Sequence, residues 1–226
     1  MRGRPYRPEQ LLGPLNLWEQ KHAPSTLYAA GRTKLLWERR PRISIIGSRK
    51  ASPEGLAAAH RAASRIAQAG GVVVSGLARG IDTAAHKGAI EARGDTIAVI
   101  GCGLDRSYPP ENAGLQQLLM NEHLVISQFP EGTPPIGGNF VQRNRTMALL
   151  SHASIIIEAG EQSGTVHQGW ETHRLGRLLL LPQELLEAQF EWPRELLKYG
   201  AVSYEGVAEL LEILGQEFPL FETAFA

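Results

Sequence analysis

The tripeptide Gly47-Ser48-Arg49 has the residue types of an anion-binding loop, and it directly follows the apolar run Ile43–Ile46. Glycine allows a ligand to approach the backbone, serine offers a hydroxyl, and the arginine guanidinium presents planar donors that suit phosphate. Ser52 is placed to cap a following helix, whose N-terminal N–H groups also favour anions. The alternative is an ordinary strand-to-helix turn with a solvated arginine.

A second loop with the same chemistry follows the apolar run Val72–Val74. Its glycines Gly76 and Gly80 frame Arg79, and Lys87 lies one to two helical turns further on. We expect Gly76, Arg79, Gly80 and Lys87 to contribute to an anion site. Asp82 is expected mainly to cap the helix that begins there.

Two further segments carry candidate ligand-binding residues. Arg143, Asn144 and Arg145 lie in a predicted helix, where the two arginines are about 200° apart and cannot face one groove. We therefore expect one arginine to bind the ligand and the other to brace a neighbouring loop or carboxylate. The segment Ser163-Gly164-Thr165 begins another predicted helix and is again suited to an anion, although Ser163 could simply be an N-cap.

These motifs are connected by a regular alternation of short apolar runs and helices. We predict strands at 43–46, 72–74, 96–100, 124–127 and 155–157 and a last strand at 178–181, with intervening helices of about a dozen residues. This pattern predicts an α/β fold, with a doubly wound, mostly parallel sheet of an extended Rossmann-like type. All the motifs lie at the carboxyl ends of strands, where such sheets bind ligands. We divide the chain into a short lead-in (1–41), a core domain (42–204) and an acidic C-terminal helix and tail (205–226).

The net charge is zero, but the charges are unevenly distributed. From Glu184 onward there are nine glutamates and only two basic residues, so residues 1–183 have a surplus of seven positive charges. A local surplus of this kind favours an anionic partner. No segment is apolar enough to span a membrane, and the single cysteine, Cys102, excludes an internal disulfide and a cysteine-rich metal site. We expect a cytoplasmic protein with no membrane partner, cofactor or metal.

Taken together and in this order, the motifs G-S-R, S-G-L-A-R-G-I-D-T-A-A-H-K-G-A, G-C-G-L-D, F-x-x-R-N-R and S-G-T resemble the DprA/Smf family of DNA-processing proteins. The resemblance implies a Rossmann-like core, here without the family's usual flanking domains. It also implies single-stranded DNA binding and protection, loading of a RecA-type recombinase onto DNA during natural transformation, homodimerisation, and no catalytic residues. Phosphate contacts would come from the loops described above, and Phe140, Tyr108 and Trp170 are the aromatic candidates for base stacking.

A nucleotide sensor or a nucleotide N-glycosidic hydrolase of the cytokinin-activating type is the alternative function. Those hydrolases, which have a similar fold, use a glutamate as general base in a P-G-G-x-G-T-x-x-E signature. Gln168 stands at the corresponding position here and cannot act as a base. Glu158 and Glu171 are possible substitutes, although each is more simply explained as a solvated or salt-bridged carboxylate.

Overall fold

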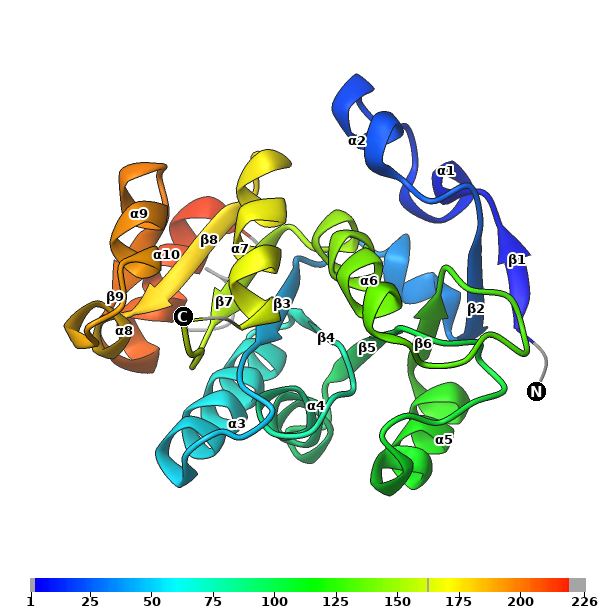
Figure 1. Cartoon of the computed structure of the whole chain (residues 1–226), viewed down its shortest axis with the longest axis horizontal. Coiled ribbons are helices and arrows are strands. Elements are labelled where there is room, and N and C mark those ends of the chain that lie inside the picture. Colours follow the sequence, from blue (N-terminus) through cyan, green and yellow to red (C-terminus); the bar gives the residue numbers. More distant parts are fainter. Residues whose placement is uncertain (1–2, 162, 220–226) are drawn as a thin grey trace.

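A single nine-stranded sheet organises the chain (Figure 1). The computed structural model describes residues 3–161 and 163–219. The strand order is β1-β2-β6-β5-β4-β3-β7-β8-β9, and all pairs from β6 to β9 are parallel. The strands are β1 Arg4–Tyr6, β2 Leu27–Gly31, β3 Arg42–Ile46, β4 Val72–Ser75, β5 Asp95–Ile100, β6 Leu124–Ser127, β7 Ala153–Ile156, β8 Leu178–Pro182 and β9 Val202–Tyr204.

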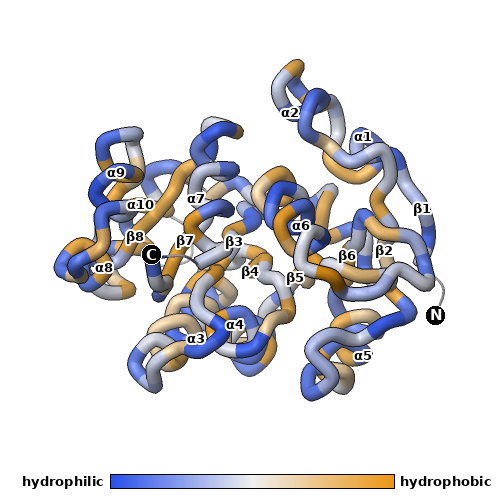
Figure 2. Tube along the Cα trace, viewed as in Figure 1, coloured by the Kyte–Doolittle hydropathy of each residue, from blue (hydrophilic) through white to orange (hydrophobic). Residues whose placement is uncertain are grey.

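Helices cover both faces of this sheet, as a doubly wound fold requires. Alternate residues of each strand point to opposite faces, so Ile43 and Val73 pack against α3, α4 and α10, whereas Val72 and Val74 pack on the side of α6 and α7. The helices are α1 Pro8–Leu12, α2 Leu17–His22, α3 Pro53–Gln68, α4 Ile81–Glu91, α5 Ala113–Glu122, α6 Gly137–Leu150, α7 Gly164–Arg174, α8 Gln183–Glu187, α9 Trp192–Lys198 and α10 Gly206–Glu217. Figure 2 shows the apolar segments concentrated on the sheet and on the helix surfaces that face it. The predicted fold class is confirmed.

The sheet extends beyond the strands that we predicted. Residues 1–41 contribute β1 and β2, which add two antiparallel strands next to β6. The strand at Leu178–Pro182 is not the last one, because β9 pairs with it further along the chain. Of the predicted acidic segment, α10 packs on the apolar cluster over α3, and residues 220–226 lie outside the described part of the chain.

The order of the strands reverses at β3. Its neighbour on one side is β4, and its neighbour on the other side is β7, which comes much later in the sequence. In open parallel sheets the loops diverge at such a switch point and leave a crevice at the carboxyl ends of the strands. Within the described residues, no helix is long and apolar enough to cross a membrane.

Candidate functional site

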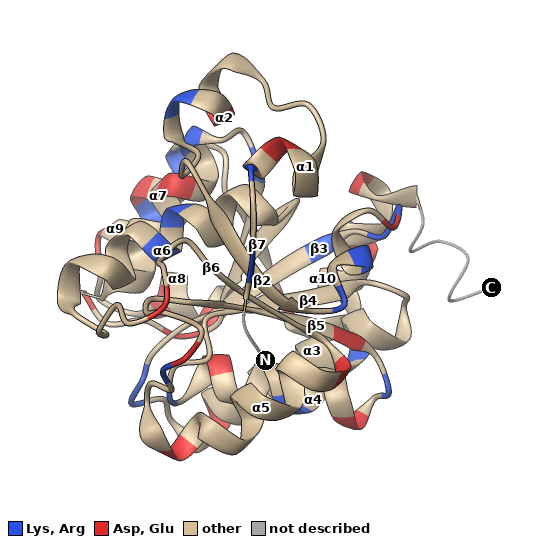
Figure 3. Cartoon of the chain, turned by 90° about the vertical axis from the view of Figure 1, so that its right-hand side faces the viewer, with Lys and Arg blue, Asp and Glu red and all other residues tan. Residues whose placement is uncertain are grey.

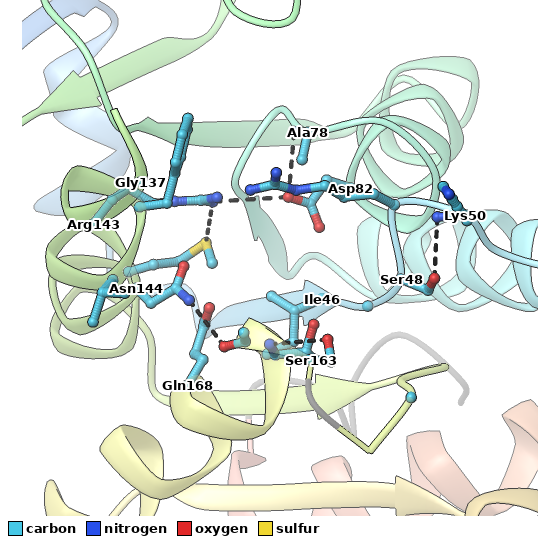
Figure 4. Close-up of a pocket in the computed structure, with 18 of the residues that line it drawn as sticks. Ile46, Ser48, Lys50, Ala78, Asp82, Gly137, Arg143, Asn144, Ser163 and Gln168 are labelled. Atoms are coloured by element: carbon cyan, nitrogen blue, oxygen red, sulfur yellow. Dashed lines mark hydrogen bonds and ion pairs between the residues drawn. The ribbon is translucent and has the colours of Figure 1, made fainter. Parts of the chain in front are cut away.

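A cavity of about 610 Å³ lies at this switch point (Figure 4). It is formed by the β3–α3 loop, one side of α6, and the β7–α7 loop with the start of α7. Nine of the residues that we predicted for the site line it: Gly47, Ser48, Arg49, Phe140, Arg143, Asn144, Ser163, Gly164 and Thr165. The structure therefore brings together three segments that are widely separated in the sequence.

Hydrogen bonds hold the β3–α3 loop in place. The Ser48 N–H donates to the Glu158 carbonyl oxygen at 2.7 Å, and the Ser48 carbonyl accepts from the Ile81 N–H at 3.2 Å. The next residue that faces the cavity, Lys50, was not predicted, although its position directly after Arg49 could have indicated it. The loop thus presents two neighbouring cations at the mouth of the cavity.

Two predicted glycines lie behind the cavity wall and not on it. A Cβ atom at Gly76 would overlap the guanidinium group of Arg143, and one at Gly80 would overlap the Ser48 carbonyl oxygen. Gly80 also has a φ of 74°, a conformation that favours glycine. Both glycines shape the site by allowing close packing, but they do not line it.

Three predicted cations and one aromatic residue also lie outside the cavity. Arg79 is exposed and forms an ion pair with Glu111, which raises the pKa of Arg79 and lowers that of Glu111. Lys87 lies on the exposed side of α4. Arg145 points away from Arg143, as the helical geometry predicted, and pairs with Glu171 at 3.1 Å. Trp170 packs edge-on against Tyr199 with ring centroids 5.2 Å apart, so it is not near the mouth.

Arg143 and Asp82 form a buried ion pair at the bottom of the cavity. Their closest atoms, Nη1 and Oδ2, are 3.7 Å apart, and the two side chains are 5% and 6% exposed. Burial raises the pKa of the Asp82 carboxyl and lowers that of the Arg143 guanidinium, and each charge partly offsets the shift of the other. Our assignment of Asp82 as the N-cap was wrong: Gly80 occupies that position, and Asp82 lies within the first turn of α4.

The guanidinium of Arg143 is only partly satisfied within the protein. Its Nε has no hydrogen-bond partner among the described residues, and its Nη1 lies 3.7 Å from the Asp82 Oδ2 and 3.9 Å from the Met147 sulfur. A buried donor without a partner is costly, and the same guanidinium group lines the cavity.

Aromatic side chains form one side of the entrance. The Arg49 guanidinium carbon lies 5.0 Å from the centre of the Phe140 ring, and the Tyr108 ring lies 5.3 Å from Phe140 on centroids. Phe140 lines the cavity, whereas Tyr108 does not line it and is 39% exposed. The stack combines a cation with flat apolar surfaces.

The N-terminus of α7 forms the opposite wall. Ser163 caps the helix by accepting from the Thr165 N–H at 3.2 Å, which was the alternative to an anion-binding role, and it also lines the cavity. Asn144 on α6 donates to the Gly164 carbonyl at 3.1 Å and so fixes this terminus against α6. The first N–H groups of α7 and its dipole therefore face the same space as Arg143.

The carboxylates that could replace the missing glutamate of a hydrolase are bound elsewhere. Glu158 accepts from the Ser52 N–H and hydroxyl at the start of α3. Glu171 is buried among Arg145, Arg174 and His167. Gln168 does line the cavity, and its amide nitrogen lies 3.5 Å from the Ser44 hydroxyl oxygen. No group of three or more His, Cys, Asp or Glu residues suited to a metal ion occurs among residues 3–161 and 163–219.

The sequence matches the family described as DNA recombination-mediator protein A over residues 8–215. It is 36% identical over 189 residues to the DNA processing protein DprA of Streptococcus pneumoniae, covering 83% of this chain and 66% of that protein. It is 38% identical over 155 residues to Protein Smf of Synechocystis sp., covering 68% of this chain and 39% of that protein. The chain thus spans between 39% and 66% of the length of these two relatives.

Solved structures show the same similarity. DNA processing protein A from Streptococcus pneumoniae superposes with a TM-score of 0.80 at 31% identity, over 94% of this chain and 74% of that one. DNA processing protein A from Helicobacter pylori, described as having a unique single-stranded DNA binding mode, gives a TM-score of 0.80 at 28% identity, over 91% of this chain and 94% of that one. The molybdenum cofactor carrier protein of Chlamydomonas reinhardtii, at 20% identity and a TM-score of 0.56, shares the fold alone, over 78% of this chain and 97% of that one.

Proposed function

Because this chain belongs to the DprA/Smf family, DNA recombination-mediator protein A, we propose that its cavity binds single-stranded DNA without sequence specificity. A backbone phosphate would lie between Arg143 and the N-terminus of α7. Arg49 and Lys50 would neutralise phosphates at the mouth, and Phe140 would stack on a base.

The partly satisfied guanidinium of Arg143 is the observation that carries this proposal. A structural ion pair at this depth would be expected to satisfy its donors within the protein, yet the Nε is unpaired among the described residues and the nearest Asp82 oxygen is 3.7 Å away. Because Arg143 lines the cavity, a phosphate oxygen bound there would add an acceptor for its guanidinium group. The positive end of the α7 dipole, which adjoins the cavity at Gly164 and Thr165, would favour the same anion.

The contacts of Glu158 and Glu171, the two possible substitutes for the hydrolase glutamate, support binding over hydrolysis. Glu158 holds the N-terminus of α3 and Glu171 is enclosed by cations, so neither is free to accept a proton from water beside the ligand. A hydrolase would release free base from a nucleoside monophosphate, and Glu171→Gln would abolish that release. We expect no release from the wild-type protein.

Loading of a RecA-type recombinase and homodimerisation are proposed from the family alone. The chain spans part of the length of its relatives, so both activities require direct tests. Sedimentation of the purified protein would give its oligomeric state, and strand-exchange assays with a recombinase would test loading.

Fluorescence anisotropy with labelled oligo-dT and oligo-dC tests the binding site. Arg49 lies at the mouth of the cavity and outside the core, so Arg49→Ala should fold normally and weaken binding to both oligomers by a similar factor. Arg61→Ala removes an exposed cation from α3, on the other face of the sheet, and should leave the affinity within twofold. An unchanged affinity in Arg49→Ala would remove that residue from the site.

A further inference from the structure

A stripe of charged residues runs along α7 away from the cavity. His167, Glu171 and Arg174 are spaced by four and three residues, so they lie on one face of the helix. Arg145 on α6 reaches the same face. None of the four lines the cavity, which adjoins the first turn of α7.

One buried carboxylate, that of Glu171, holds the other three side chains. Glu171 Oε1 lies 2.7 Å from the Arg174 Nη1, 3.1 Å from the Arg145 Nε and 3.4 Å from the His167 Nε2. The Glu171 side chain is 4% exposed, whereas those of Arg145 and Arg174 are about half exposed, at 46% and 49%. The Glu171 carboxylate therefore lies below the protein surface, and it holds the guanidinium groups of Arg145 and Arg174 at that surface.

A second buried carboxylate binds an arginine just beyond the end of α7. Arg177 forms an ion pair with Glu19 on α2, and Glu19 is also buried by its capping contacts with Asn16. Elsewhere on α2, the Lys21 Nζ lies 5.3 Å from the centre of the exposed Trp18 ring. Figure 3 shows lysine and arginine gathered over α2, α6 and α7 on this side of the molecule.

We propose that this surface, formed by Arg145, Arg174, Arg177, Lys21 and Trp18 and here called the α7 track, binds the continuation of the strand held in the cavity. The inference rests on the proposed function and extends it. Four cations and two buried carboxylates leave a local surplus of two positive charges. From Gly164 to Arg174, the two ends of α7, the rise along the helix is about 15 Å, enough for a few nucleotides. Trp18 at the far end offers a ring for a base.

The buried carboxylates explain why the track favours an extended polyanion. Glu171 holds both Arg145 and Arg174 while their side chains stay about half exposed, so little side-chain entropy is lost when a phosphate binds them. The track begins at the helix whose N-terminus forms a cavity wall, which gives one continuous path for a strand. An acidic protein segment could bind the same cations. Unlike a DNA strand held in the cavity, however, it would gain nothing from the proximity of the track to the cavity.

Oligonucleotide length separates the track from the cavity. We would measure binding of dT3, which can fill only the cavity, and of dT20 to the wild type and to Arg174→Gln, Lys21→Gln and the double variant. Arg174→Gln leaves Glu171 paired with Arg145, so the fold should be retained, as thermal unfolding would show. Arg61→Gln on α3 is the matched control.

The expected result is a loss of at least fivefold in dT20 affinity for the double variant, with dT3 binding unchanged within twofold. The slope of log K against log salt for dT20 should become shallower by about 1.4, because two phosphate contacts on a single strand are lost. Trp18→Ala should weaken dT20 binding by about tenfold and leave dT3 unaffected.

Three results would overturn the α7 track. Unchanged dT20 affinity and salt slope in the double variant would show that the surface does not contact DNA. An equal loss for dT3 and dT20 would show that these residues act on the cavity itself. Stronger competition by poly-glutamate than by dT20 would assign the surface to an acidic protein. If the wild type binds neither oligomer, the proposed function fails first, and this inference fails with it.

Discussion

Arg143 on α6 reaches Asp82 on α4 at 3.7 Å, and both side chains are almost fully buried beneath the cavity. The pair links two helices on opposite faces of the sheet at its carboxyl edge. It also places a positive charge where a ligand can complete its hydrogen bonds. The Arg143–Asp82 contact is thus expected to affect both the stability of the fold and the binding of a ligand in the cavity.

Removal of the acidic partner should be strongly destabilising. Asp82→Asn leaves the Arg143 charge buried without compensation, and we expect the free energy of unfolding to fall by about 3–5 kcal/mol. Urea unfolding at pH 7 would measure the loss. The double variant Asp82→Asn/Arg143→Met should recover part of it, and a loss below about 1 kcal/mol in the single variant would show that the pair is not coupled.

Phe140 should contribute to affinity through its flat ring. Phe140→Leu keeps an apolar side chain but removes the stacking surface, and we expect binding of dT20 and dA20 to weaken by about 1–3 kcal/mol each. Trp170→Leu is the matched control, because Trp170 packs against Tyr199 outside the cavity. Anisotropy titrations would measure both, and a loss in Trp170→Leu equal to that in Phe140→Leu would argue against a specific role of Phe140.

Gly80 should be required for the position of the Ser48-Arg49 loop. Its φ is 74°, and a Cβ atom there would collide with the Ser48 carbonyl oxygen. Gly80→Ala should therefore cost about 1–3 kcal/mol of stability and also weaken DNA binding. Gly114 lies exposed in α5 with no neighbour within reach of an added methyl group, so Gly114→Ala should stabilise the protein by up to about 1 kcal/mol. Equal effects of the two substitutions in urea unfolding would contradict this explanation.

Stability should decrease as the pH falls below neutrality. Burial lowers the pKa of His86 from 6.5 to about 3, so the unfolded state binds a proton that the folded state excludes. This destabilising contribution is small above pH 6.5 and grows as the pH falls toward 3. Between pH 7 and pH 5 it should remove about 2 kcal/mol. In His86→Gln the drop over this interval, measured by urea unfolding, should be smaller by that amount; an identical drop would exclude His86 as its source.

The central strands could be predicted from the sequence, whereas the edge strands could not. Ile43–Ile46 and Val72–Val74 are buried on both faces, so their apolar runs identify them. Arg4–Tyr6 and Val202–Tyr204 are three-residue edge strands with no apolar run. These edge strands are defined by hydrogen bonds to strands that are distant in the sequence, and no local sequence pattern indicates that pairing.

Within the site, helical geometry was predictable and side-chain direction in loops was not. The separation of Arg143 from Arg145 followed from the fixed period of a helix, and Arg145 indeed braces a carboxylate. Arg79 was expected at the site because its loop follows the carboxyl end of a strand. The structure turns it toward Glu111, whose proximity depends on how η2 (Pro110–Asn112) packs beside α4. A rule that places loops at one edge of a sheet does not determine which side chains point into the cavity.

A salt-titrated comparison of ligand length is the sharpest test of whether the cavity binds single-stranded DNA. The dissociation constants of dTMP, a dT dinucleotide and dT20 would be measured from about 50 to about 300 mM salt. We predict that affinity rises with length, that dT20 binding weakens steeply with salt, and that Arg49→Ala reduces it. Tighter binding of the mononucleotide or dinucleotide than of dT20, with little dependence on salt, would contradict DNA binding and assign the cavity to a small nucleotide.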